Sequence, residues 1–264
     1  MEQWLIVLGL INIALLIIGI KLLLPGKVFE TSIAEHYGIG KTHLPYILII
    51  IGVVVIHLIE VNFIDPHTTA WVGVDFAEAI QSIEGDAVVW FSQHWTPVLV
   101  YFFVLMYIAV YPFTLWFSIL YFLLVNEKRA MKNLAYGLLL IYAVALPFYL
   151  FIPITNVYMY NNIDSALENV IPTVERLFYS MTTQNNCLPS LHVAMVILVA
   201  WSVRLTGNKK FTYFAYFSMI SVIIAVIYLA IHWITDVICG MLLASAVVLI
   251  LRHFIKEEET YGTS

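Results

Sequence analysis

The chain has 264 residues, of which 62% are hydrophobic and only 11% are charged, and its mean hydropathy is +0.93. Soluble domains are roughly half apolar and about a quarter charged, so this composition excludes an ordinary soluble fold and indicates a membrane protein. The formal net charge of -5 provides no basic surface of the kind that nucleic-acid binding requires. Cys187 and Cys239 are too few for a disulfide framework and have no zinc-ligand spacing, so we interpret both as small apolar side chains.

Seven apolar segments are long enough to cross a bilayer, whose hydrocarbon core of about 30 Å needs about 20 apolar residues per helix. Helices are required because lipid offers no partners to an exposed backbone. We therefore predict an all-α polytopic membrane protein with about seven transmembrane helices, and we expect the first to be a retained span and not a cleaved signal. The segments lie near residues 4–24, 44–64, 96–125, 133–153, 190–206, 211–230 and 233–253.

Basic residues concentrate in short cytoplasmic loops, so their distribution predicts the orientation of the chain. With seven spans, Arg176 alone falls on one side of the membrane. This predicts an extracytoplasmic N-terminus and a cytoplasmic C-terminus. The basic residues predicted on the cytoplasmic side are Lys21, Lys27, Lys41, Lys128, Arg129, Lys132, Arg204, Lys209, Lys210, Arg252 and Lys256.

Two long connections, about 65–95 and 154–189, then lie on the extracytoplasmic face. The first is acidic and contains no Lys or Arg. Apolar residues recur in it at near-helical spacing, which favours a short helix along the membrane interface, with a solvated acidic loop as the alternative. These residues are Val74, Ala77, Ile80 and Ile83.

The first candidate motif is Pro189-Ser190-Leu191-His192, at the predicted outer end of a span. Proline suits the first positions of a helix and serine suits the N-cap, so this motif predicts a helix start. The N–H groups of such a start attract phosphate.

The second candidate motif is His232-Trp233-Ile234-Thr235-Asp236. In a helix, residues four apart share one face, so Asp236 can hold the His232 imidazole in one tautomer. The alternative is a structural hydrogen-bonded pair. The orientation of the spans places Ser190, His192 and His232 at the same membrane face, although 40 residues separate the two histidines.

Together these motifs resemble the type 2 phosphatidic acid phosphatase (PAP2) superfamily, which shares a PSGH motif, an HxxxD motif and a helical membrane core. Leu191 replaces the glycine of PSGH, and with Tyr228-Leu229 before His232 this form is similar to the inositol phosphorylceramide synthase branch. The resemblance covers roughly 96–253, which suggests a division into two N-terminal helices with the interfacial segment (1–95), a catalytic core (96–253) and a cytoplasmic tail (254–264).

The resemblance implies that His232 attacks phosphorus to form a phosphohistidine, that Asp236 orients it, and that His192 protonates the departing oxygen. Ser190 and nearby amides would hold phosphate oxygens. Phosphoryl transfer depends mainly on positioning and on stabilising the equatorial oxygens, so these roles are also physically reasonable. We expect no metal or organic cofactor, and a phospholipid or polyprenyl phosphate as substrate.

The chain lacks the superfamily's usual Lys and Arg phosphate clamps, since no Lys-x6-Arg-Pro stretch lies in its outer part and Ala225-Val226 stands where Ser-Arg is expected. Arg176 is our candidate replacement because of its predicted position, although it could instead pair with a neighbouring acidic residue. Tyr228 is a candidate phosphate contact, with core packing as the alternative.

Two other classes of protein fit parts of the pattern. A metal-dependent hydrolase could use His192, His232 and Asp236 as ligands to zinc or manganese, and chelator sensitivity would identify it. A lipid or solute transporter would place ionisable residues near the membrane midplane and often contains inverted repeats, which this sequence lacks. The predicted gathering of the key residues at one face favours the enzyme. Water and an alcohol both remain open as acceptors.

Overall fold

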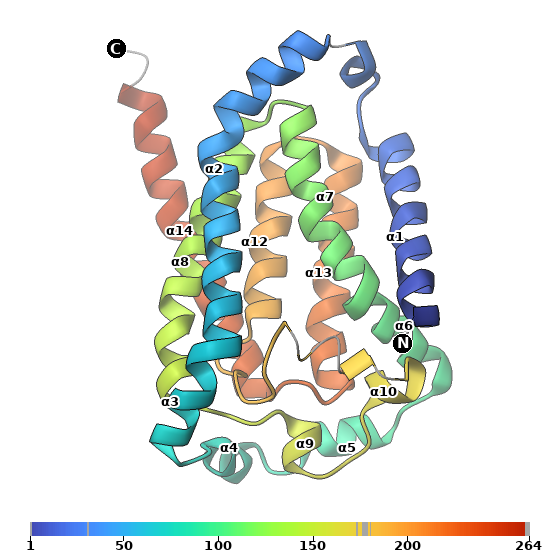
Figure 1. Cartoon of the computed structure of the whole chain (residues 1–264), viewed down its shortest axis with the longest axis vertical. Coiled ribbons are helices and arrows are strands. Elements are labelled where there is room, and N and C mark those ends of the chain that lie inside the picture. Colours follow the sequence, from blue (N-terminus) through green and yellow to red (C-terminus); the bar gives the residue numbers. More distant parts are fainter. Residues whose placement is uncertain (1, 31, 173, 176–178, 180, 262–264) are drawn as a thin grey trace.

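The computed structural model describes residues 2–30, 32–172, 174–175, 179 and 181–261, which form a helical bundle without a strand (Figure 1). The described part contains six helices long and apolar enough to cross a membrane, and a shorter apolar helix, Leu191–Leu205. The predicted all-α polytopic fold is therefore confirmed. The six are Ile6–Leu23, Ala34–Val72, Pro97–Leu124, Lys128–Phe151, Lys209–Tyr228 and Ile234–Phe254.

Successive long helices run through the bundle in opposite directions, so every connection lies at one of its two ends (Figure 1). A 3-10 turn, η1 (Gly26–Glu30), joins the first two crossings, and a π-helical turn, η3 (Met106–Val110), interrupts the third. In chain order, the crossing helices are α1 (Glu2–Leu23), α2 (Ile33–Ile59), α6 (Pro97–Leu105) with α7 (Tyr111–Leu124), α8 (Lys128–Phe151), α12 (Leu191–Leu205), α13 (Lys209–Tyr228) and α14 (Ile234–Tyr261).

The second crossing is longer than predicted. We expected it to end near residue 64, but α2 continues through a π turn, η2 (Glu60–Ile64), into α3 (Asp65–Val72). Glu60 and Asp65, the charged residues at this end of the apolar segment, are buried and hydrogen-bonded, so the helix continues past them. Asn186 Nδ2 donates to Glu60 Oε1 at 2.8 Å, and Thr69 Oγ1 donates to Asp65 Oδ1 at 3.3 Å.

Helix α12 lies at the centre of the bundle and packs against α8, α13 and α14. Its contact with α8 is close at Gly137, where an added Cβ would lie 2.4 Å from Leu198 Cδ1. Small residues let helix backbones approach in this way inside membranes, where dispersion contacts replace the hydrophobic effect between helices. α12 is therefore held rigidly from several sides.

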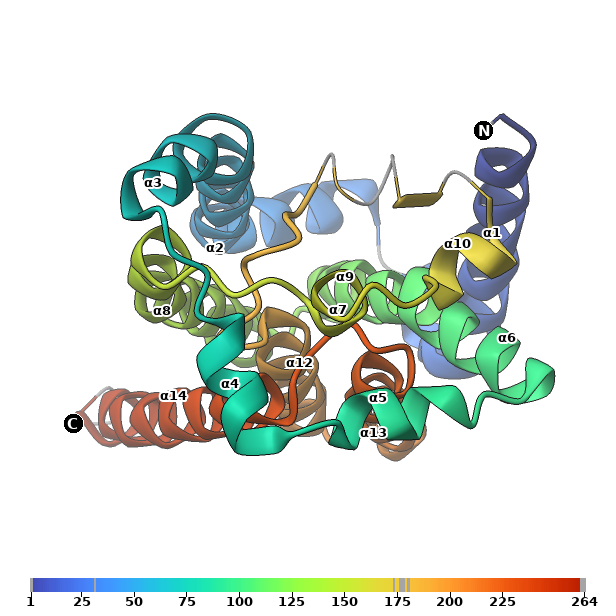
Figure 2. The same cartoon turned by 90° about the horizontal axis from the view of Figure 1, so that it is seen from below.

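Short helices and loops cover one end of the bundle, as Figure 2 shows. The predicted interfacial segment contains a helix, α4, so that expectation is confirmed at the level of secondary structure. The covering helices are α4 (Ala77–Glu84), α5 (Ala87–Gln93), α9 (Val157–Tyr160) and α10 (Ala166–Val170).

Backbone hydrogen bonds join the loops of this end to one another. Ile154 N–H donates to Asn185 O at 2.7 Å, and Asn156 N–H donates to Gln184 O at 2.8 Å. Two further bonds run from Tyr158 N–H to Ala230 O at 3.0 Å and from Trp233 Nε1 to Thr155 O at 2.9 Å. The segment after α8 thus lies between the loop that precedes α12 and the turn that precedes α14.

Basic side chains gather at the other end of the bundle. Lys21 lies in the last turn of α1, Lys128 begins α8, Arg204 lies in the last turn of α12 and Lys209 begins α13. Each of these helix termini lies at the end away from α4, α5, α9 and α10 (Figure 1).

Candidate functional site

Ser190 begins α12 in the manner that the sequence predicts. Its Oγ accepts a hydrogen bond from Val193 N–H at 3.4 Å, which is the geometry of a helix N-cap. Its own N–H donates to the Asp236 carbonyl oxygen at 3.0 Å. This bond places the start of α12 directly against the start of α14.

His232 lies in a tight turn between α13 and α14 and not within a helix. Ala230 adopts a left-handed φ of 55°, and Ile231 N–H donates to Val226 O at 2.9 Å while Ala230 N–H donates to Ile227 O at 3.0 Å. These two bonds define a Schellman motif, in which a left-handed residue ends a helix. The expectation that His232 and Asp236 share one helix face is therefore wrong, because the helix that carries Asp236 begins two residues after His232.

The turn nevertheless brings His232 and Asp236 together. Asp236 occupies the first turn of α14, and its Oδ2 accepts from Trp233 N–H at 2.9 Å, as the acidic residue of a capping box does. The same oxygen lies 3.3 Å from His232 Nδ1. Asp236 is 0% exposed and His232 4% exposed, so little water competes for this contact.

A line of hydrogen bonds leads from Asp236 across both histidines. His232 Nε2 lies 3.4 Å from His192 Nδ1, and His192 Nε2 lies 3.1 Å from the hydroxyl of Tyr107. Tyr107 belongs to the π turn η3 and is 2% exposed. Three residues predicted for catalysis are thus brought together, although their side chains come from separate parts of the chain.

The proton positions along this line follow from the chemistry of imidazole. The Asp236 carboxylate can only accept, so His232 carries its proton on Nδ1 and presents a lone pair at Nε2. His192 then donates from Nδ1 to that lone pair, and its own Nε2 accepts from Tyr107. His232 Nε2 is therefore basic, and it faces the His192 ring, whose Nδ1 carries a proton.

The two histidine rings are too close together to admit a phosphate between them. At 3.4 Å, His232 Nε2 and His192 Nδ1 are in hydrogen-bond contact, and a phosphorus atom with its oxygens does not fit between them. Phosphate chemistry at His232 therefore requires one ring to rotate. His192 is partly buried and His232 is buried, so we assign the rotation to the His192 ring.

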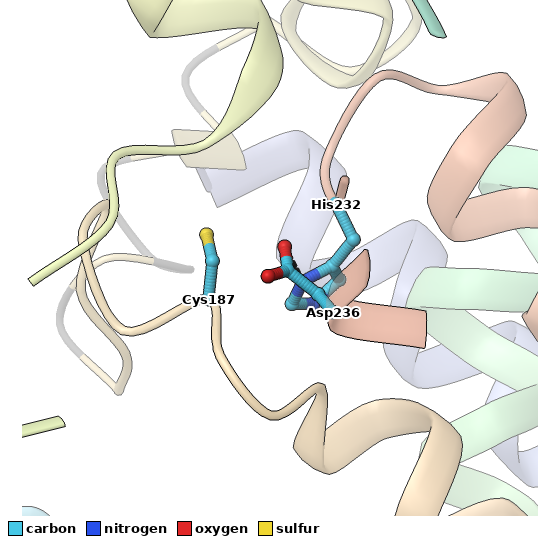
Figure 3. Close-up of side chains that lie close together, drawn as sticks. All are labelled: Cys187, His232 and Asp236. Atoms are coloured by element: carbon cyan, nitrogen blue, oxygen red, sulfur yellow. Dashed lines mark hydrogen bonds and ion pairs between the residues drawn. The ribbon is translucent and has the colours of Figure 1, made fainter. Parts of the chain in front are cut away.

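Cys187 completes a buried cluster on the other side of Asp236. In the view of Figure 3, the Asp236 carboxylate lies between the Cys187 sulfur and the His232 ring. One ligand atom from each of these three residues lies within 4.8 Å of the others. Among the described residues, this cluster has the composition and spacing to hold a metal ion. The metal site considered from the sequence had His192 as its third ligand, whereas the structure has Cys187 in that place. Burial, followed by the charges of Asp236 and Asp75, raises the pKa of the Cys187 thiol.

Tyr228, predicted to contact phosphate, binds the loop between α5 and α6. Its hydroxyl accepts from Thr96 N–H at 2.9 Å, and its carbonyl oxygen accepts from Trp95 Nε1 at 2.5 Å. Its ring also packs against Phe91 and Phe103. These contacts agree with the core-packing alternative. A contact between Tyr228 and the substrate stays a prediction. Arg176, the candidate phosphate clamp, lies outside the described residues.

Glu84 acts on the site through the backbone. Its two carboxylate oxygens accept from Ile234 N–H at 2.9 Å and from Thr235 N–H at 2.6 Å, so they satisfy the first amides of α14. A negative charge at a helix N-terminus is also favoured by the helix dipole. Glu84 therefore anchors the start of the helix that carries Asp236.

Neither Glu84 nor Tyr107 could be singled out from the sequence. Glu84 is one of several acids in its loop, and its partners lie 150 residues away. Tyr107 is one of 16 tyrosines and stands in an uninterrupted apolar run. Only the fold shows that the π turn η3 brings its hydroxyl to His192.

Comparison with known families agrees with this geometry. A sequence model described as PAP2 superfamily matches residues 79–250, more than half of the chain. The protein therefore belongs to the PAP2 superfamily, whose members are phosphatases and phosphotransferases. No curated protein and no solved structure matches the chain. The matched region begins within α4 and contains both histidine motifs.

Gly240 lets α14 approach the start of α12, and an added side chain there should impair catalysis. A Cβ at this position would lie 2.6 Å from the carbonyl oxygen of Ser190, a backbone atom that cannot swing aside. We predict that Gly240→Ala lowers kcat by at least about 10-fold, since a displacement of about 1 Å can cost about 100-fold.

Gly52→Ala is the matched control, because no atom lies within 4 Å of an added Cβ at that helical position. Steady-state rates of the two purified variants check the prediction. A Gly240→Ala protein with the wild-type kcat would show that the contact between the two helix starts does not matter for the reaction.

Removal of the Glu84 charge should weaken the anchor of α14. Glutamine keeps the length of the side chain but can accept from only one of the two amides, and its NH₂ group faces the other. We predict that Glu84→Gln lowers the free energy of unfolding by about 1 kcal/mol, because one amide of α14 loses its partner in a partly buried place.

Glu78→Gln, on the same short helix, serves as the control because Glu78 is exposed. The midpoint of thermal unfolding in detergent is the measurement. Equal midpoints for Glu84→Gln and Glu78→Gln would contradict the anchoring role.

Proposed function

We propose that this PAP2 protein is an integral membrane phosphatase or phosphotransferase that acts on a lipid-headgroup phosphate through a phosphohistidine at His232. The observation that carries this proposal is the line from Asp236 through His232 to His192. Asp236 binds Nδ1 of His232 at 3.3 Å, which leaves Nε2 as the nucleophile on the side where His192 stands. A base or nucleophile oriented by a third group is the recurring requirement of covalent catalysis.

In the first half-reaction, the His232 Nε2 lone pair forms a bond to phosphorus and the bond from phosphorus to the leaving oxygen breaks. His192, which becomes imidazolium by taking a proton from solvent or from the bound phosphate monoanion, gives one proton to the leaving oxygen and returns to its neutral form. His192 is then basic, and in the second half-reaction it removes a proton from water or an alcohol, whose oxygen attacks phosphorus and releases His232. The Tyr107 hydroxyl, hydrogen-bonded to His192 Nε2, positions the ring before phosphate enters.

Asp236 supports both half-reactions by stabilising charge on His232. The imidazole becomes positive as the N–P bond forms, and a buried carboxylate 3.3 Å away favours that state. Burial strengthens the effect because little solvent screens the pair. Ser190 and the first amides of α12 are our candidates for holding phosphate oxygens, with Arg176 as the source of positive charge.

The substrate is proposed to be a phospholipid or a polyprenyl phosphate that reaches the site from the extracytoplasmic or lumenal leaflet. The separation of the site from the basic helix ends supports this orientation, with the N-terminus outside and the C-terminus cytoplasmic. Leu191 in place of the PSGH glycine supports a place near the inositol phosphorylceramide synthase branch, in which case an alcohol acts as acceptor.

A metal-dependent hydrolase is the second candidate, because the ligand atoms of Cys187, His232 and Asp236 lie within 4.8 Å of one another. In that mechanism a metal-bound water would replace the histidine nucleophile. Activity that EDTA abolishes and added metal restores would support this candidate against the phosphohistidine.

Three substitutions test the proposed roles. Purified protein is incubated with a panel of lipid phosphates, with and without inositol or diacylglycerol acceptors, while free phosphate and new lipid are measured. We expect His232→Ala to reduce turnover to background and His192→Ala to reduce it by about 10²–10⁴-fold, the usual contribution of proton transfer. Asp236→Asn should lose about 10⁴-fold because an amide favours the wrong histidine tautomer.

Arg176→Ala serves as a graded comparison and should lose less than these three, since it contributes charge and no chemical step. If all three histidine and aspartate variants keep nearly wild-type turnover on every active substrate, the assigned site is wrong. Appearance of new lipid at the expense of free phosphate would identify a transferase.

A further inference from the structure

The cluster of Cys187, His232 and Asp236 has the composition of a transition-metal site. Its side chains offer a sulfur, an imidazole nitrogen and a carboxylate oxygen, all within 4.8 Å of one another. Cys187 is 4% exposed, His232 4% and Asp236 0%, so the three groups face one another and not solvent. They come from three places: the loop before α12, the turn before α14, and the first turn of α14 itself (Figure 3).

A second observation points to a ligand at the same place. Asp236 Oδ2 accepts from Trp233 N–H and contacts His232 Nδ1, whereas Asp236 Oδ1 is buried and has no hydrogen-bond partner. A buried carboxylate oxygen without a partner is costly, and proteins rarely leave one. The Cys187 thiol makes only long contacts, with its sulfur 3.9 Å from the carbonyl oxygens of Gln184 and Ile231.

We propose that Cys187, His232 and Asp236 form an inhibitory Zn²⁺ site that overlaps the catalytic histidine. Zinc binds thiolate, imidazole and carboxylate at about 2.0–2.3 Å, and the observed spacing reaches this geometry with small side-chain rotations. Three protein ligands leave a fourth position for water or a phosphate oxygen. Binding displaces the thiol proton to solvent, so the Zn–S bond forms with release of one H⁺.

Zinc at this site blocks His232 whichever ring nitrogen it takes. A metal on Nε2 occupies the nucleophilic lone pair directly. A metal on Nδ1 leaves the ring proton on Nε2, and a protonated nitrogen cannot attack phosphorus. The inhibition rests on the proposed function of His232, whereas the binding of metal does not.

The first experiment measures binding without any reaction. Purified full-length protein in detergent is titrated with Co²⁺ as a spectroscopic substitute for zinc, and zinc content is measured after equilibration and desalting. We expect a near-ultraviolet sulfur-to-cobalt charge-transfer band and one zinc per chain. Both should be lost in Cys187→Ser and in Cys187→Ala, and both should persist in Cys239→Ser, the matched control with the other cysteine.

The second experiment measures turnover of a lipid phosphate against buffered free Zn²⁺. We expect zinc to inhibit the wild type and Cys239→Ser reversibly, with recovery on addition of chelator. In Cys187→Ser and Cys187→Ala, the zinc concentration for half-inhibition, taken relative to each variant's own zinc-free turnover, should rise more than about 10-fold. Even changes outside the first ligand shell cost about 10–100-fold in metal affinity.

Three outcomes would overturn the inhibitory site: no charge-transfer band in the wild type, equal zinc sensitivity with and without Cys187, or activation by zinc. Use of two Cys187 variants separates loss of the ligand from a defect caused by one substitution. A cobalt band that depends on Cys187, in a protein without activity on any lipid phosphate, would leave the metal site standing and reject the proposed function.

Discussion

The hydrogen bond from Ser190 N–H to the carbonyl oxygen of Asp236, 3.0 Å long, joins the two helix starts on which the site is built. Helix starts carry unsatisfied amides, and at the boundary of a membrane protein each needs a partner. The Ser190 amide connects α12 to α14, and Gly240 provides the space for the approach. Because both histidines lie within two residues of a helix start, this contact helps to set their separation.

The surrounding loops support that contact. Glu84 binds the first amides of α14, the segment around Ile154 pairs with the loop before α12, and Trp233 donates to Thr155. Each of these partners is distant in sequence, so the cost of ordering the loops is offset by contacts that form only in the complete fold. The layer over one end of the bundle is therefore a support for the proposed catalytic residues.

Much of this arrangement could be predicted from the sequence, and the reasons for the exceptions are physical. Apolar length and the N-cap preference of serine are local properties, which is why the helical spans, apart from the end of the second crossing, and the start of α12 were predicted correctly. The spacing of His232 and Asp236 indicated the right pair for the wrong reason. A Schellman turn at Ala230 replaces the expected helix. The apolar residues around Ala230 give no sequence signal for a left-handed backbone. Tyr107, Glu84 and Cys187 reach the site only through tertiary contacts.

We propose that Asp236 and the turn before α14 make His232 a nucleophile toward phosphorus. The most direct measurement is to incubate the protein with a lipid phosphate labelled in its phosphoryl group, stop the reaction in alkali, and map the label by mass spectrometry. We expect an acid-labile phosphohistidine at His232 that is absent from His232→Ala. Label on His192, or turnover without any covalent phosphoenzyme, would contradict it.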